Sequence, residues 1–249
     1  MPLCDTHCHL TVPEIPGGFG AAAARARSAG VSHIVVVESD PARFRETPGL
    51  CSREPGLLPA CGIHPCYLPA NPDAAIESLK AVADSLVAIG EIGLDGTAGD
   101  LPEQERVFRA QLQIAKDARK PILIHCRRAL PRLLAILKDF GCPPGVMHCY
   151  SGSAEQLPPL LDVGLYISYA GVVTFPGARK VHPALAATPL DRVLLETDSP
   201  DLAPHPLRGT VNEPANLPLV AQGVADSLHL SFEKISEITF ANSRQLFGF

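Results

Sequence analysis

Eight short runs of β-branched and other apolar residues recur along this chain of 249 residues, and stretches of helical character separate them. The runs occupy residues 3–10, 33–39, 56–64, 87–95, 121–127, 145–151, 165–171 and 192–198. Short strands that alternate with helices predict parallel pairing through right-handed crossovers. Eight such units close a (β/α)8 barrel, so we expect an α/β fold in which residues 1–249 form a single TIM-barrel domain.

The segments between the runs have the pattern of helices that cover a barrel. Apolar residues recur at a spacing of three to four over residues 130–140 and stop at Gly141, which predicts a helix with one buried face. Another helix is expected to begin near Pro102, because acidic residues follow it at positions that the helix dipole favours. The proline-rich residues 199–216 predict a loop, followed by helices at about 217–229 and 232–247.

Composition and charge exclude several classes of protein. The formal net charge of −5 does not suit a protein that coats duplex nucleic acid through a basic surface. No uncharged apolar run approaches the roughly 20 residues that cross a bilayer, so we expect no membrane insertion. The N-terminal residues lack the pattern of a secretory signal, which predicts a reducing, cytoplasmic location in which the eight cysteines stay free.

Polar residues that can bind metals fall near the ends of six of the predicted strands. They are His7, His9, His64, Glu91, His125, His148 and Asp198. The carboxyl ends of the strands in a TIM barrel meet at one face, and active sites are built there from several strands. We therefore expect these side chains to meet in space.

The alternation of side chains along a strand predicts which of them point into the barrel. His7 and His9 share one face, and His125 and His148 face away from the cysteines that follow them. Four cysteines are then expected to pack outward beneath the helices as small apolar side chains, namely Cys4, Cys8, Cys126 and Cys149. The chain has no C-x-x-C pair, so a cysteine-rich zinc site is not expected.

Four imidazoles and two carboxylates at one barrel mouth suit divalent cations that take nitrogen and oxygen ligands, such as Mg²⁺, Mn²⁺ or Zn²⁺. Two ions can share a carboxylate, and Glu91 is the central candidate for that bridge. Taken alone, Glu91 could equally form an interior salt bridge, and Asp198 could cap a turn. Four other histidines are interpreted as ordinary structural residues, namely His33, His182, His205 and His229.

An ordered set of motifs resembles the TatD-type metal-dependent deoxyribonuclease family. It comprises H-x-H at 7–9, GIHP at 62–65, GEIGLD at 90–95, IHCR at 124–127, HCYSGS at 148–153, ETDSP at 196–200, VNEPAN at 211–216 and NSRQLFG at 242–248. The resemblance implies an amidohydrolase-type (β/α)8 barrel with two divalent metal ions. It also implies Mg²⁺-dependent removal of nucleotides from DNA 3′ ends, with DNA or another phosphodiester bound locally at the active site.

By this resemblance, His7, His9 and Asp198 hold one ion, His125 and His148 hold the other, and Glu91 is shared between them. The physical chemistry of phosphodiester hydrolysis adds roles for further residues. Asp198 would accept a proton from the attacking water, while His64 and Arg127 would bind a phosphate oxygen or the leaving group. Glu196 and Asp5 have the strand parity to orient metal-binding histidines from behind.

Two departures and two rival functions qualify this interpretation. Many relatives have a histidine where this chain has Cys66, and an aromatic or arginine-bearing stretch where it has residues 96–99, so a contact with a base or phosphate is expected to be absent.

One rival is a carbonyl hydrolase of the amidohydrolase group, such as an aminoacyl-tRNA deacylase. Relatives with a carboxylated lysine bridge need Lys on the fourth strand, where this chain has Glu91. The other rival is a metal-binding barrel without catalysis; no obligate protein partner is predicted.

Overall fold

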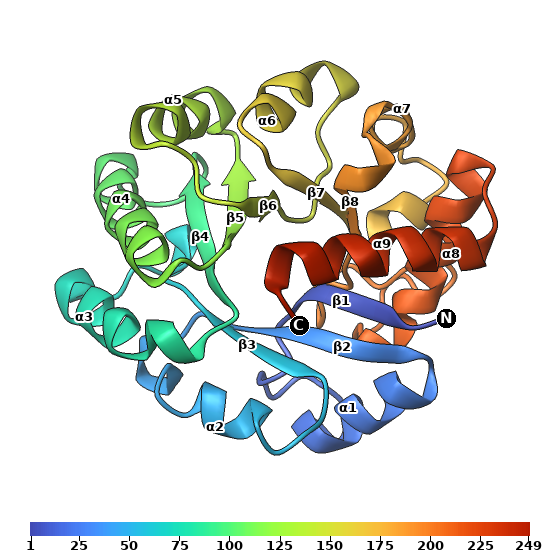
Figure 1. Ribbon diagram of the computed structural model, residues 1–249, viewed down its shortest axis with the longest axis horizontal. Coiled ribbons are helices and arrows are strands. Elements are labelled where there is room, and N and C mark those ends of the chain that lie inside the picture. Colours follow the sequence, from blue (N-terminus) through green and yellow to red (C-terminus); the bar gives the residue numbers. More distant parts are fainter.

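Eight parallel strands form one barrel in the order in which they occur along the chain (Figure 1). The computed structural model describes residues 1–249. The strands are β1 (Leu3–Cys8), β2 (Val31–Glu38), β3 (Leu57–Cys61), β4 (Ala88–Asp95), β5 (Ile122–Arg127), β6 (Gly145–Met147), β7 (Tyr166–Tyr169) and β8 (Val193–Leu195). The predicted TIM barrel is therefore confirmed.

The barrel closes between its first strand and the segment that follows its last strand. The Asp198 amide donates to the carbonyl of His7 at 3.0 Å, and the His9 amide donates to the carbonyl of Ser199 at 2.8 Å. The same segment forms a parallel bridge between Cys8 and Ser199. These bonds hold the first and last of the predicted metal-binding residues side by side.

Helices surround the barrel on its outer side. They are α1 (Gly18–Ser28), α2 (Thr47–Cys51), α3 (Pro72–Val82), α4 (Leu101–Ala118), α5 (Leu130–Phe140), α6 (Pro158–Asp162), α7 (Val181–Ala187), α8 (Leu217–Leu228) and α9 (Phe232–Phe247). α5 ends at Phe140 and is followed by Gly141, whose φ of 79° suits glycine, so the predicted stop at Gly141 is confirmed. None of these helices has the length and apolar character that a membrane span requires.

Two apolar cores stabilise the barrel. The larger one fills the layer between the strands and the helices. The smaller one lies inside the barrel, where Val35, Leu123 and Leu194 meet Leu246 and Phe247 from the end of α9. α9 runs across one end of the barrel and brings the C-terminus close to its axis (Figure 1). This end of the barrel is therefore filled by apolar side chains.

Several strands are shorter than the sequence predicted, and this corrects the placement of the polar residues. β6 ends at Met147 rather than at 151, and β8 ends at Leu195 rather than at 198. The chain turns out of extended conformation there, with φ of 46° at Cys149 and 56° at Asp198. His9, His64, His148 and Asp198 consequently lie in the loops that follow their strands, whereas Glu91 lies within β4.

Two buried glutamines of α4 connect this helix to the loops at the carboxyl ends of β3 and β4. The Gln111 side chain accepts from the Ile63 amide at 2.7 Å and donates to the Ile63 carbonyl at 3.1 Å. The Gln104 side chain accepts from the Asp95 amide at 2.8 Å and donates to the Asp95 carbonyl at 3.1 Å. Because seven residues separate them, both glutamines lie on one face of the helix. They fix the backbone directly before His64 and at Asp95.

Candidate metal centre

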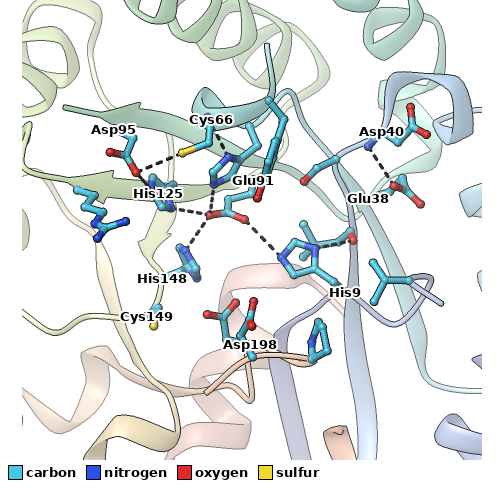
Figure 2. A pocket seen from close by; sticks show the side chains of 18 of the residues that line it. His9, Glu38, Asp40, Cys66, Glu91, Asp95, His125, His148, Cys149 and Asp198 are labelled. Carbon is cyan, nitrogen blue, oxygen red and sulfur yellow. Dashed lines mark hydrogen bonds and ion pairs between the residues drawn. The ribbon is translucent and has the colours of Figure 1, made fainter. Parts of the chain in front are cut away.

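An open cavity of about 1200 Å³ occupies the carboxyl ends of the strands. Its wall includes six of the seven predicted site histidines and carboxylates: His9, His64, Glu91, His125, His148 and Asp198. His7 lies beneath them and is fully buried. Figure 2 shows His9, His125 and His148 turned toward Glu91. The residues that are scattered over the sequence therefore meet at one place.

The Glu91 carboxylate is the centre of this cluster. Its Oε1 lies 2.8 Å from His125 Nδ1, 2.9 Å from His148 Nε2 and 3.1 Å from His64 Nε2. Its Oε2 lies 3.3 Å from His7 Nε2 and 3.6 Å from His9 Nε2. One carboxylate thus faces five imidazoles from four parts of the barrel. This is the geometry of a shared acidic ligand.

Three sets of donor atoms lie close enough to hold a cation, with every atom of a set within 4.8 Å of the others. The first set is His7, His9 and Asp198, the second is His7, Glu91 and His148, and the third is His64, Cys66 and His125. The first set matches the ligands that the resemblance implies for one ion. His125 belongs to the third set, and its Nδ1 also shares Glu91 Oε1 with His148 Nε2, at 2.8 and 2.9 Å.

Electrostatics inside the cluster favour a charged Glu91. Burial alone would raise the pKa of its carboxyl, but the charge of His148 and hydrogen bonds from His125, His148 and His64 hold that pKa well below its usual value. Burial would lower the pKa of His148, yet Glu91 and Glu196 raise it well above its usual value. Burial and the charge of His148 lower the pKa of His7 to about 4, so this imidazole is neutral at neutral pH and has a free lone pair.

Asp198 lies on the opposite side of the cavity from the β4 and β5 side chains. Its Oδ1 is 3.8 Å from His7 Nε2, and its side chain is partly exposed to the cavity. Burial raises the pKa of its carboxyl to about 7, against the opposing charge of His148. A carboxyl with a pKa near neutrality can take up and release a proton under physiological conditions.

Glu196 and Asp5 contact the cluster from behind, in different ways. Glu196 Oε1 accepts from the Cys149 amide at 2.6 Å and lies 3.3 Å from His148 Nδ1. Asp5 does not reach the His7 ring. Its carboxylate instead accepts from the His7 amide at 3.3 Å and from the Thr197 amide at 2.9 Å, and so joins β1 to the segment after β8.

Sequence reasoning missed Asp95. This buried carboxylate accepts from Cys66 Sγ at 3.2 Å, and its Oδ2 is 3.2 Å from His125 Nε2. Two signals could have identified it, because Asp95 ends the predicted strand 87–95 and has the same parity as Glu91. Tyr67 was also missed: its ring is 72% exposed at the cavity wall, 5.2 Å from the His64 ring.

The predicted outward packing of the cysteines is wrong for one of the four, Cys149. Cys8 is fully buried within the core between the barrel and the helices, and Cys4 is buried near Ser243 of α9. Cys126 borders the cavity but packs against the same core as Cys8. Cys149, however, lines the cavity and is not part of that core. The parity rule fails at Cys149 because β6 has already ended and this residue has a positive φ. The four histidines interpreted as structural are absent from the cavity wall.

The donor set fits divalent cations. His7 Nε2 faces His9 Nε2 at 3.3 Å, and both face Glu91 Oε2, so nitrogen and oxygen lone pairs converge on the same small space. His7 Nδ1 is buried without a hydrogen-bond partner, which costs free energy that a bound cation at the other ring nitrogen can offset. Imidazole nitrogens and carboxylate oxygens are ligands for Zn²⁺ and Mn²⁺.

Together, the parallel barrel and the donor ring at its carboxyl ends define a metal-dependent hydrolase. A sequence profile described as TatD related DNase matches residues 4–248. The chain therefore belongs to the TatD family, and the resemblance seen in the motifs is confirmed.

Relatives of known sequence or structure support this assignment. The metal-dependent hydrolase YabD of Bacillus subtilis is 36% identical over 251 residues, which cover 98% of this chain and 98% of the relative. A Klebsiella pneumoniae protein named 3′-5′ ssDNA/RNA exonuclease TatD is 34% identical over 98% of this chain and 97% of its own length. The crystal structure of the TatD homologue YjjV from Escherichia coli K12 is 31% identical, with a TM-score of 0.93 over 99% of this chain and 98% of that one.

Proposed function

We propose that this protein hydrolyses phosphodiester bonds as a 3′-5′ exonuclease that depends on two divalent ions, and that DNA is its substrate. The observation that carries the proposal is the ring of five imidazoles and Asp198 around Glu91 in an open cavity. The similarity to a relative named as an exonuclease supports the choice of a nucleic acid. Mg²⁺, Mn²⁺ or Zn²⁺ held there would lower the pKa of water and neutralise charge on the phosphate.

The roles of the chain's own residues follow from their positions. His7, His9 and Asp198 would hold one ion, His125 and His148 would hold the other, and Glu91 would be shared between them. Asp198 accepts the proton of the attacking water, because it borders the open cavity and its pKa is about 7.

Residues at the wall of the cavity bind the substrate. His64 lies 3.1 Å from Glu91 and would meet a phosphate oxygen beside the ions. Arg127 ends β5, is exposed to solvent and lines the cavity, so its guanidinium is free to bind a second phosphate. Tyr67 offers an exposed aromatic face on which a base can stack. Glu196 and Asp5 keep the metal-binding segments in place.

A nuclease assay tests the proposal. Purified protein with Mg²⁺ or Mn²⁺ is incubated with single-stranded DNA that carries a 5′ label, beside EDTA-treated protein and the Asp198→Asn variant. Stepwise shortening from the 3′ end that is lost with EDTA and in the variant is expected. Intact DNA in the presence of bound metal would refute the proposal and favour a carbonyl hydrolase, for which esters and aminoacyl-tRNA are the substrates to screen.

The cellular setting forms part of the same proposal. All eight cysteines are free thiols, which suits a reducing compartment, and we place the protein in the cytoplasm. No protein partner is needed for the cluster, since one chain supplies every donor atom.

A further inference from the structure

The donor set of His64, Cys66 and His125 lies on the β3–β5 side of the cavity. The proposed hydrolysis of phosphodiesters does not use the Cys66 sulfur. The Cys66 amide donates to His64 Nδ1 at 3.1 Å, which fixes these two residues relative to each other. Figure 2 shows the Cys66 sulfur, the His125 ring and Asp95 facing one another beside Glu91.

His125 turns its two ring nitrogens toward two different carboxylates. Its Nδ1 lies 2.8 Å from Glu91 Oε1, and its Nε2 lies 3.2 Å from Asp95 Oδ2. The Nε2 side of the ring therefore faces Asp95 rather than Glu91. A cation bound at this side of the ring would have Nε2 and Asp95 Oδ2 as neighbouring ligands.

Asp95 is held so that only one of its oxygens faces this space. Its Oδ1 accepts from the Thr97 amide at 2.8 Å and from Thr97 Oγ1 at 2.5 Å. Its Oδ2 lies 3.2 Å from Cys66 Sγ and 3.2 Å from His125 Nε2. Zinc bonds of about 2.0–2.3 Å in a tetrahedron place neighbouring ligand atoms about 3.3–3.7 Å apart. Both observed separations are close to that edge length.

We propose that Cys66 Sγ, His125 Nε2 and Asp95 Oδ2 form a binding site for a zinc-like cation, distinct from the site of His7, His9 and Asp198. One sulfur, one nitrogen and one oxygen can supply three of the four ligands of a tetrahedral Zn²⁺, whereas Mg²⁺ does not favour a sulfur ligand. Ligation releases the Cys66 thiol proton to solvent. The other donor sets of the centre contain no sulfur, so the cavity has a thiolate-bearing side and an oxygen-rich side.

Cobalt replaces zinc as a probe because a thiolate bound to Co²⁺ gives a charge-transfer band in the near ultraviolet. The full-length protein is stripped with a chelator and titrated with Co²⁺, beside the Cys66→Ser and Cys149→Ser variants. Cys149 is the matched control, because its thiol lines the same cavity. The wild type and Cys149→Ser are expected to develop the band, and Cys66→Ser is not.

A second variant separates loss of the ligand from loss of the fold. Cys66→His restores a nitrogen ligand, so it is expected to keep the wild-type zinc content after gel filtration while lacking the cobalt band. Cys66→Ser is expected to bind one equivalent of zinc less than the wild type. A wild type without the band, or a Cys66→Ser variant that keeps it, would overturn the proposal. These readouts do not involve DNA, so they are independent of the outcome of the nuclease assay.

Discussion

Gln111 is expected to contribute a large share of the local stability of the loop that carries His64. The side chain bonds both the amide and the carbonyl of Ile63, which is 1% exposed, so water cannot replace either contact. In Gln111→Met, a side chain of similar length fills the space without hydrogen-bonding groups. Each orphaned backbone group costs about 1–3 kcal/mol, and the two together lower the free energy of unfolding by about 2–6 kcal/mol.

Urea unfolding followed by circular dichroism measures this change, with Gln113→Met as the matched control. Gln113 lies on the same helix, but its side chain is exposed and contacts only Asp117 at 2.7 Å. The control is expected to stay within about 0.5 kcal/mol of the wild type. A Gln111→Met variant as stable as the control would refute the argument that this glutamine satisfies buried backbone groups.

Four further results are expected. Glu196→Gln removes the negative charge beside His148 and should weaken metal binding about 10- to 100-fold in a chelator competition; unchanged affinity would contradict the role of Glu196. Tyr67→Ala should raise the KM for single-stranded DNA by a factor that corresponds to about 1–3 kcal/mol, with kcat unchanged, whereas Tyr67→Phe should match the wild type. Burial and the charge of Arg244 lower the pKa of His33 in the folded protein below 6.5, so the unfolded chain binds this proton more tightly and protonation opposes folding. As the pH drops through 6.5, the urea midpoint should therefore fall less in His33→Gln than in the wild type. Removal of divalent ions with EDTA should lower Tm, because ions that bind only the folded state add about 2.7 kcal/mol at a concentration 100 times their Kd.

The sequence was sufficient to predict the barrel and most of the donors around Glu91, because both follow from local periodicity. It was insufficient wherever the chain leaves regular conformation. Strand parity placed Cys149 outside the barrel, but this residue lies in a turn with positive φ and lines the cavity. The contacts of Gln111 could not be predicted, since they join a helix to a loop 48 residues away. The pairing of Cys66 with Asp95 depends on the same kind of tertiary contact.

The charge of the cavity makes substrate binding depend on its cations. Seven carboxyl groups line it against a single guanidinium, that of Arg127, and they belong to Glu14, Glu38, Asp40, Glu91, Asp95, Asp198 and Asp201. Two like charges 4 Å apart repel by about 4 kcal/mol at the effective dielectric of a protein surface, so the protein alone disfavours a phosphate. Two divalent ions add four positive charges beside the phosphate and weaken this field. Because coupling between two ligands is reciprocal, a bound phosphodiester must also tighten the ions, and their affinity measured without substrate is the weaker of the two.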